Sequence, residues 1–415
     1  MKAPGVAMAA AIALASRAQA AAQAGPDRWR AEPFKLTSPG GDIELGLAGY
    51  VQEDLRSYRD WEPADPRTSE LRRIRIGVEG RWKRLSFQVD VDPRRERPED
   101  TVEGAHYLKN AYVELRLAKA FRIRGGHFKL PFSPEFLTSA AKTDFIERSM
   151  LVDALGLDRD WGGVVLGEIG RVRYEAGVFQ GDGGRTHQRA GTTGAARLEV
   201  TPLTGLDLGA SYNDGRVTAD DEALGAAEPK GFSARGPTGF RFSVRHFVDG
   251  HRRRLGADGT LHRGPVGLKG EIARGWEERK GQGATFDELP QAVTTGWAVS
   301  GTWLATGDKK RGTIRPRHPF PHGVGAVEFG VRYESVQVDD DGPDAGFAGA
   351  GNRARNILPV GERVWTGGVS WWPRQWLRFL ANVVVERFDD DLIVPEPGRG
   401  GNYVTILGRL QLALP

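Results

Sequence analysis

Apolar and polar residues alternate strictly in segments of about ten residues along most of the chain, and this pattern constrains the fold more than any other feature. In one such segment, Phe87 and Val89 alternate with Gln88 and Asp90. Successive side chains of a strand point to opposite faces of a sheet, so each segment is predicted to form a strand with one apolar and one polar face. The chain is therefore predicted to be all-β.

Two further features favour a transmembrane barrel over a soluble sandwich, in which alternation also occurs. The connections between the segments alternate between short and long, as they do when short turns lie at one end of a barrel and long loops at the other. Aromatic residues concentrate near the ends of the segments, where the interface girdles of a membrane barrel lie. The tryptophans in such positions are Trp82, Trp276, Trp297, Trp303, Trp365, Trp371, Trp372 and Trp376.

The number of strands follows from a parity argument. The pattern contains seventeen candidate strands, whereas bacterial single-chain barrels have an even number. If 238–247 is left out, every long connection except 306–324 lies at one end of the barrel. The other long connections are 53–70, 93–106, 130–162, 215–250, 279–293, 339–361 and 390–400. We therefore predict a transmembrane antiparallel β-barrel of about 16 strands over residues 42–415, with 238–247 inside a long loop.

The N-terminus is typical of a secretory signal over residues 1–20. Lys2 supplies a positive start, 6–15 is apolar, and Ala18–Ala20 is a small-residue cleavage site. Residues 21–41 are polar and are predicted to form an exposed leader. No later window approaches the roughly 18 consecutive apolar residues of a membrane helix. The chain is therefore predicted to be exported without a membrane-spanning helix.

Composition and motifs argue against an enzyme. The chain has no cysteine, which excludes thiol catalysis and cysteine metal sites. His246, Asp249 and His251 lack a cluster of further ligands. Gly181–Gly184 lacks the helix and the lysine of a phosphate-binding loop. No catalytic residue, cofactor or metal site is predicted, although the tryptophans leave open a periplasmic or surface carbohydrate-binding β-protein as an alternative.

The most specific signal is a set of motifs around two of the long connections. In chain order they are Gly125–Ser133, Leu137–Ser139, Phe145–Arg148, Arg159–Gly162, Trp303–Asp308 and Gly325–Tyr333. In these residues the chain resembles the phosphate-selective porin O and P family, and the resemblance extends over most of 42–414.

The resemblance implies a porin of the bacterial cell outer membrane. Such a protein forms a water-filled channel for passive diffusion of small anions, here phosphate or polyphosphate, with a weakly selective general porin as the alternative. The third external loop, about 130–162, would fold inward and narrow the channel. Its apolar residues would pin it to the wall, namely Phe132, Phe136, Leu137, Phe145 and Ile146.

The resemblance also implies partners. We expect a homotrimer surrounded by outer-membrane lipid and lipopolysaccharide. The net charge is only +4, so charge alone does not select a polyanion and no nucleic-acid partner is expected.

Candidate anion-binding residues combine the resemblance with strand parity, because guanidinium groups suit bidentate contact with phosphate oxygens. They are Arg73, Arg75, Lys129, Ser133, Lys142, Arg148, Arg332 and Arg409. Lys129 shares parity with outward residues, so a role in the lumen requires a bulge at Gly125–Gly126. The alternative is a polar, unselective lumen in which inward arginines pair with inward acids. Those acids are Glu79, Glu114, Glu328, Glu334 and Glu386.

Overall fold

The fold is seen in a computed structural model of the chain. The residues described are 30–32, 34–61, 63, 68–93, 107–181, 189–218, 233–283, 285–310, 312–342, 357–390 and 393–414. The expected signal segment 1–20 falls outside these ranges, as does most of the connection 93–106. Within the expected leader, β1 (Arg30–Glu32) and β2 (Lys35–Thr37) form a hairpin, and β2 pairs with the first strand of the barrel.

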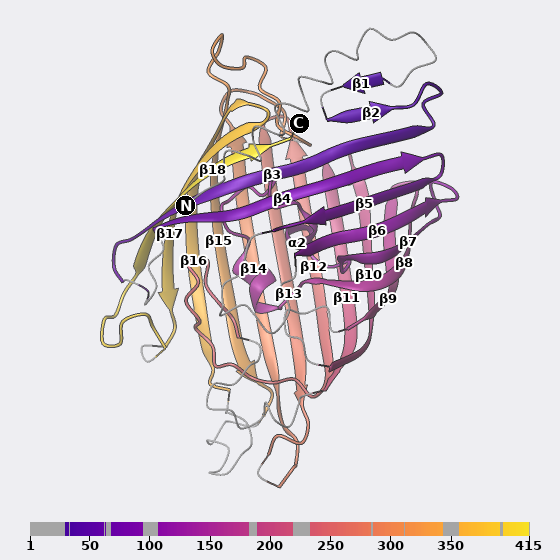
Figure 1. Cartoon of the computed structure of the whole chain (residues 1–415). Helices are drawn as coiled ribbons and strands as arrows, with labels where there is room; N and C mark the ends of the chain where they lie inside the picture. Colours follow the sequence, from indigo (N-terminus) through magenta and orange to yellow (C-terminus); the bar gives the residue numbers. More distant parts are fainter. Residues whose placement is uncertain are drawn as a thin grey trace.

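Sixteen strands form one closed antiparallel barrel, in which each strand pairs with its neighbours in sequence (Figure 1). They are β3 (Ile43–Tyr58), β4 (Ser69–Trp82), β5 (Leu85–Val91), β6 (Leu108–Arg116), β7 (Arg122–Lys129), β8 (Arg159–Ile169), β9 (Val172–Gln180), β10 (Arg189–Leu203), β11 (Leu206–Thr218), β12 (Gly250–Arg263), β13 (Val266–Arg279), β14 (Leu289–Leu304), β15 (Ala326–Asp340), β16 (Val360–Arg374), β17 (Leu377–Phe388) and β18 (Tyr403–Ala413). The barrel closes where β18 pairs with β3, from Thr405 opposite Tyr58 to Ala413 opposite Tyr50.

The parity prediction is confirmed. The segment 238–247 is described and forms no strand; its residue Arg241 forms an isolated β-bridge with Arg235. One end of the barrel therefore carries short turns, such as the one at Gly170 between β8 and β9. The other end carries long loops, and the connection 305–325 is the long exception at the short-turn end.

The outer face of the barrel carries two rows of aromatic side chains. Trp297 and Trp303 stand six residues apart on β14, roughly 20 Å along the strand. Trp365 and Trp371 repeat this spacing on β16, and the Tyr333 ring contacts both Trp297 and Trp365. Exposed apolar side chains between two such rows are the pattern of a wall that faces lipid.

Trp372 is an exception among the tryptophans expected at the interface. Its side chain is buried on the inner face, where the Arg378 guanidinium lies 4.3 Å from the ring centroid. It follows the outward Trp371, so alternation along the strand turns it inward. Among the described residues, no helix is long and apolar enough to cross a membrane.

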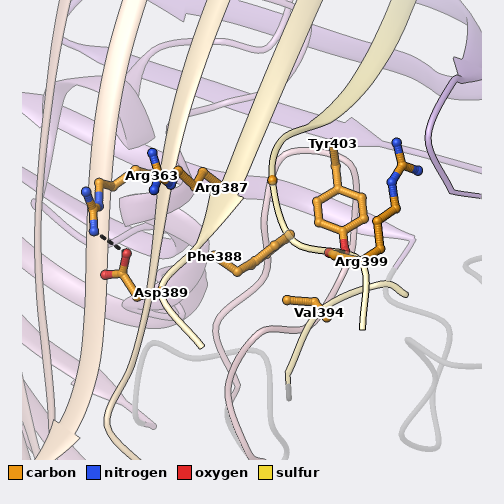
Figure 2. A pocket seen from close by; sticks show the side chains of 8 residues that line it. Arg363, Arg387, Phe388, Asp389, Val394, Arg399 and Tyr403 are labelled. Atoms are coloured by element: carbon orange, nitrogen blue, oxygen red, sulfur yellow. Dashed lines mark hydrogen bonds and ion pairs between the residues drawn. The ribbon is translucent and has the colours of Figure 1, made fainter. Parts of the chain in front are cut away.

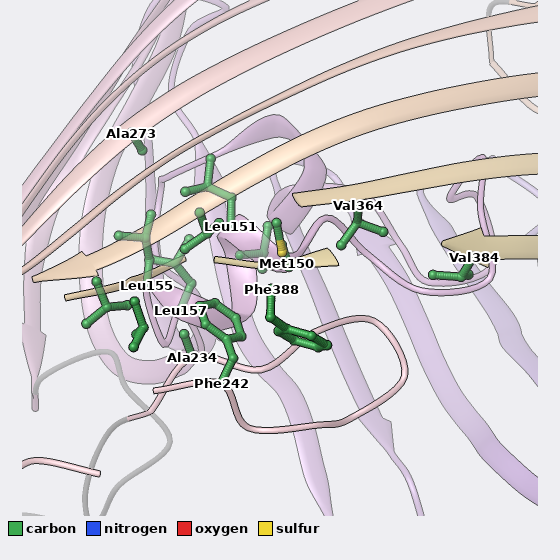
Figure 3. Packing of buried hydrophobic residues seen from close by; sticks show 14 of the residues in the cluster. Met150, Leu151, Leu155, Leu157, Ala234, Phe242, Ala273, Val364, Val384 and Phe388 are labelled. Atoms are coloured by element: carbon green, nitrogen blue, oxygen red, sulfur yellow. The ribbon is translucent and has the colours of Figure 1, made fainter. Parts of the chain in front are cut away.

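The third loop, residues 130–158 between β7 and β8, folds into the barrel as predicted. It contains two short helices, α2 (Pro134–Leu137) and α3 (Met150–Ala154). Four of its five expected pinning residues are buried and Leu137 packs beside them; the four are Phe132, Phe136, Phe145 and Ile146. The main hydrophobic core therefore lies inside the barrel, between this loop and the inner face of β13 to β18 (Figure 3).

A second inward segment comes from the fifth loop, between β11 and β12. Ala234 and Phe242 belong to the same buried cluster as Leu155 and Leu157 of the third loop (Figure 3). The sequence placed 238–247 in this loop but contained no signal that the loop enters the barrel. The third loop is thus enclosed by wall on one side and by the fifth loop on another.

Candidate functional site

Arginines of the inner wall hold the backbone of the third loop. Arg409 of β18 donates to the carbonyl of Ile146 (2.7 Å). Arg332 of β15 donates to the carbonyls of Glu147 (3.1 Å) and Arg148 (3.3 Å). Both guanidiniums are almost fully buried. These two candidate residues therefore lie beneath the loop and fix its path.

Strand β17 adds two more attachments. Arg378 donates to the carbonyls of Thr143 (2.8 Å) and Asp144 (3.3 Å). The side-chain oxygen of Asn382 accepts a hydrogen bond from the backbone nitrogen of Ile146 (2.8 Å). Loop backbone has no strand ladder to satisfy it, so buried side chains of the wall provide the partners.

Asp144 connects the third loop to the short-turn end of the barrel. Its carboxylate contacts the ammonium groups of Lys269 (2.7 Å) and Lys310 (2.6 Å). Lys310 belongs to the connection 305–325 and also contacts Glu328 (2.5 Å). Burial opposes ionisation of Asp144, but the two ammonium groups outweigh it and hold its pKa below the ordinary value. The long connection at the short-turn end thus supports the third loop.

Glu147 makes a similar attachment on the opposite side of the loop. Its carboxylate contacts Arg56 (3.0 Å) and Arg72 (3.5 Å). Burial opposes its ionisation, yet the neighbouring guanidiniums prevail and lower its pKa below the ordinary value of 4.5. The attachment therefore contributes stability at pH values above 4.5, and that stability is lost as the pH falls through the lowered pKa.

Three of the candidate residues fasten the helix α2. The Lys129 ammonium donates to the carbonyl of Thr138 (3.0 Å) and to the two carbonyls before it. The Ser133 hydroxyl caps the helix by accepting from the backbone nitrogen of Phe136 (3.1 Å). Arg148 donates to the carbonyl of Thr138 as well (2.5 Å). Their polar groups are thus directed at the loop itself.

The bulge required for Lys129 at Gly125–Gly126 is absent. Strand β7 pairs with β8 without a shift from Arg122 to Lys129. Lys129 is the last residue of β7, so its side chain reaches the loop without any change of register.

Glycines on the inner wall make room for the apolar side chains of the third loop. A Cβ at Gly296 of β14 would lie 2.8 Å from a Leu151 methyl carbon, closer than real Cβ contacts. Three more wall glycines stand against loop side chains in the same way. The pairs are Gly256 with Phe132, Gly275 with Leu155 and Gly330 with Phe145. Glycine in a strand usually weakens it, and here its missing side chain lets another segment approach closely.

Replacing Gly296 with valine is expected to destabilise the protein by about 1–3 kcal/mol, because overpacking forces Leu151 and Val336 to move. Urea-induced unfolding in detergent measures the loss. The matched control is Gly301→Val on the outer face of the same strand, where the added Cβ would lie 3.4 Å from Leu268. Equal stability of the two variants would contradict the packing described.

Two guanidiniums on the wall opposite the apolar core are linked through Asp90 and Asn110. Arg75 of β4 contacts Asp90 (2.9 Å), and Asp90 also accepts from the Asn110 amide (2.9 Å). The oxygen of that amide accepts from Nε of Arg159 (3.0 Å). Arg159 has one acid nearby, Asp158, at 3.8 Å. These contacts set two guanidiniums against two carboxylates.

Two further cations belong to β4 and to the third loop. Arg73 donates to the side-chain oxygen of Gln52 (3.0 Å), and the Gln52 amide donates to the carbonyl of Ala140 in the third loop (3.0 Å). Lys142 follows shortly after and is exposed. In the part of the chain that the structure describes, neither Arg73 nor Lys142 makes an ion pair. We call Arg73, Arg75, Lys142 and Arg159 the basic corner.

Other inward arginines of the open wall are paired with acids. Glu114 contacts both Arg122 (3.0 Å) and Arg124 (2.7 Å). Arg197 contacts Asp258 (2.6 Å). Much of the lumen therefore has the mixed character that the sequence allowed as the alternative.

The sequence did not single out several residues that shape the site. Arg159 stands in the motif Arg159–Gly162, which marked it as notable but not as a cation of the lumen. Lys269 and Lys310 have no motif signal, and only the fold brings them to Asp144.

Comparisons with known proteins also indicate a porin. Residues 46–396 match the family model described as phosphate-selective porin O and P. An uncharacterised protein of Caulobacter vibrioides is 26% identical over 395 residues, covering 85% of this chain and 70% of that protein.

Two solved structures share the fold. The anion-selective porin from Comamonas acidovorans has a TM-score of 0.56 at 12% identity, covering 90% of this chain and 100% of that one. The trimer form of OmpT, an outer membrane protein of Vibrio cholerae, has a TM-score of 0.55 at 12% identity, with 90% and 99% covered.

Proposed function

The chain belongs to the phosphate-selective porin O and P family and is a porin of the outer membrane, and from this premise we propose that its channel prefers small anions, phosphate or polyphosphate in particular. The proposed narrow part lies where the third loop meets the open wall. A preference of this kind requires positive charge that attracts the ion without holding it so tightly that it cannot leave.

The observation that carries the proposal is the basic corner. Arg75 and Arg159 are linked through Asp90 and Asn110, and Arg73 and Lys142 have no ion pair within the described ranges. The corner therefore carries a net positive charge beside the third loop. The candidates Lys129, Ser133, Arg148, Arg332 and Arg409 have a different role in this proposal, which is to hold the loop that narrows the lumen.

A weakly selective general porin is the second candidate. The ion pairs of Glu114 with Arg122 and Arg124 favour it, because paired charges cancel at the distances over which a passing ion senses them. In that case the channel discriminates little between anions and cations.

Planar-bilayer recording separates the two candidates. In a potassium chloride gradient, an anion-preferring channel has a reversal potential of the sign set by chloride, and added phosphate reduces the chloride current. A reversal potential near zero, with no effect of phosphate, would establish the general porin instead. The same recording also tests whether the wild-type protein forms a conducting channel.

We also propose that the barrel assembles as a homotrimer, in line with the family resemblance and with the trimer form known for the structurally similar Vibrio cholerae protein. Light scattering of the detergent-extracted protein gives the stoichiometry. A monomeric mass at all concentrations would contradict it.

A further inference from the structure

A basic pocket lies at the rim of the barrel at the long-loop end, lined both by arginines of the outer face and by Phe388, Val394 and Tyr403 of the buried core. It has a volume of about 200 Å³ and is lined by three arginines and one aspartate, together with apolar and aromatic groups (Figure 2). The charged residues are Arg363, Arg387, Arg399 and Asp389. Neither the arginines that hold the third loop (Arg332, Arg378 and Arg409) nor the residues of the basic corner line this pocket.

Arg363 and Arg387 point out of the barrel. Each is exposed and stands between two buried residues of its strand, so alternation places it on the outer face. On β16, Arg363 lies two residues before Trp365 and is therefore nearer the long-loop end, by roughly 7 Å along the strand. The exposed Trp365 belongs to the aromatic row that marks the membrane interface. The two guanidiniums therefore stand at the level of lipid head groups.

The pair of arginines is electrostatically unfavourable as it stands. Arg363 and Arg387 are directly opposite each other on paired strands, where like charges repel. Asp389 contacts Arg363 and neutralises one charge (Figure 2). Arg387 has no ion pair with any described residue. An anion between the strands would relieve the repulsion and satisfy the unused donors.

Arg399 completes the charged surroundings of the pocket from the eighth loop. It contacts Asp60 of the first loop (2.7 Å) and lies 3.8 Å from Glu396. The Arg399 contact lowers the pKa of Asp60, which is thus held ionised as the partner of Arg399. Arg399 therefore holds the first and eighth loops together. Arg387, and the donors of Arg363 that Asp389 does not use, can bind a ligand.

We propose that Arg363 and Arg387 form a binding site for the phosphate group of an outer-leaflet lipid, the phosphorylated sugar head of lipopolysaccharide. Guanidinium groups bind phosphate oxygens through paired N–H donors, and a lipid presents its phosphate at this height while its acyl chains lie along the apolar wall below. The site rests on the outer-membrane location of the protein, and it is independent of which ion the channel prefers.

The test uses the full folded protein in detergent and native mass spectrometry with bisphosphorylated lipid A as the probe. The variant Arg363→Gln/Arg387→Gln is expected to raise the dissociation constant for lipid A about tenfold, because the contacts of both arginines with phosphate are lost. Asp389→Asn is expected to lower it severalfold, because it removes the competing carboxylate from Arg363. Dephosphorylated lipid A is expected to bind wild type and variants equally.

The control variant is Arg84→Gln/Arg263→Gln, which removes two exposed charges at the short-turn end and is expected to bind like wild type. Heat-modifiable migration on gels confirms that each variant is folded. Equal binding of lipid A by wild type and the Arg363→Gln/Arg387→Gln variant would overturn the proposal. Displacement of lipid A by millimolar inorganic phosphate would also overturn it, since the site would then belong to a free anion.

Discussion

Replacing Arg409 with methionine is expected to destabilise the protein by about 3–5 kcal/mol and to increase single-channel conductance. Arg409 and Asp54 form an almost fully buried ion pair with two contacts, of 2.6 and 2.7 Å. Removal of the guanidinium leaves the Asp54 carboxylate buried without its partner. The carbonyl of Ile146 loses its donor at the same time, so the third loop loses one of its attachments to β18, while the Gln411 amide still donates to the carbonyl of Ala141 (3.0 Å). Urea unfolding measures the first effect and bilayer recording the second.

A second variant separates the two consequences. In Asp54→Asn/Arg409→Met the buried unpaired charge is gone, so much of the stability is expected to return, while the contact with Ile146 stays lost and conductance stays high. Arg81→Met is the control, since its contact with Glu44 is exposed and contributes little. If conductance fell back to the wild-type value in the double variant, the contact of Arg409 with Ile146 would not be what limits the conductance.

The double variant Arg73→Gln/Lys142→Glu is expected to lower the anion-to-cation permeability ratio about three- to tenfold. It makes the basic corner more negative by three charges, each acting on a permeating ion over several ångströms of water. These two positions are chosen because neither side chain has an ion pair among the described residues, so no buried acid is stranded. By contrast, a change at Arg75 would leave Asp90 without its cation. The reversal potential in a salt gradient measures the ratio.

The matched control is Arg263→Gln/Lys119→Glu, which changes the charge equally at the short-turn end. Lys119 is exposed there beside Glu168, and Arg263 is exposed as well. A smaller change in reversal potential is expected from this variant, since its charges lie away from the third loop. Equal effects of the two variants would show that selectivity depends on overall charge and that the basic corner has no special part.

The candidate site could be read from the sequence only in part, and the reason is visible at single residues. Parity correctly placed Arg332 and Arg409 on the inner face, because alternation along a strand is a local property. It carried no information on what lies against that face. The carbonyls of 146–148 come from a loop far away in sequence, and they occupy both guanidiniums.

The same limit explains the residues that sequence reasoning missed. Lys310 lies in the connection 305–325, which appeared only as a long turn that broke the alternation of loop lengths. Its ammonium meets Asp144 across 166 positions of sequence. The wall glycines are a related case. Only the fold shows that Gly296 faces Leu151.

By itself, the sequence determined that this chain is a sixteen-stranded membrane barrel, whereas the inward third loop was implied by the family resemblance of its motifs. It could do so because strand alternation, turn length and interface aromatics are set by each segment's own contact with lipid, water or backbone. The tertiary structure alone decided which inward arginines hold the third loop and which form the basic corner. That division depends on which groups barrel closure brings close together inside the lumen, because the attraction between charges weakens with distance.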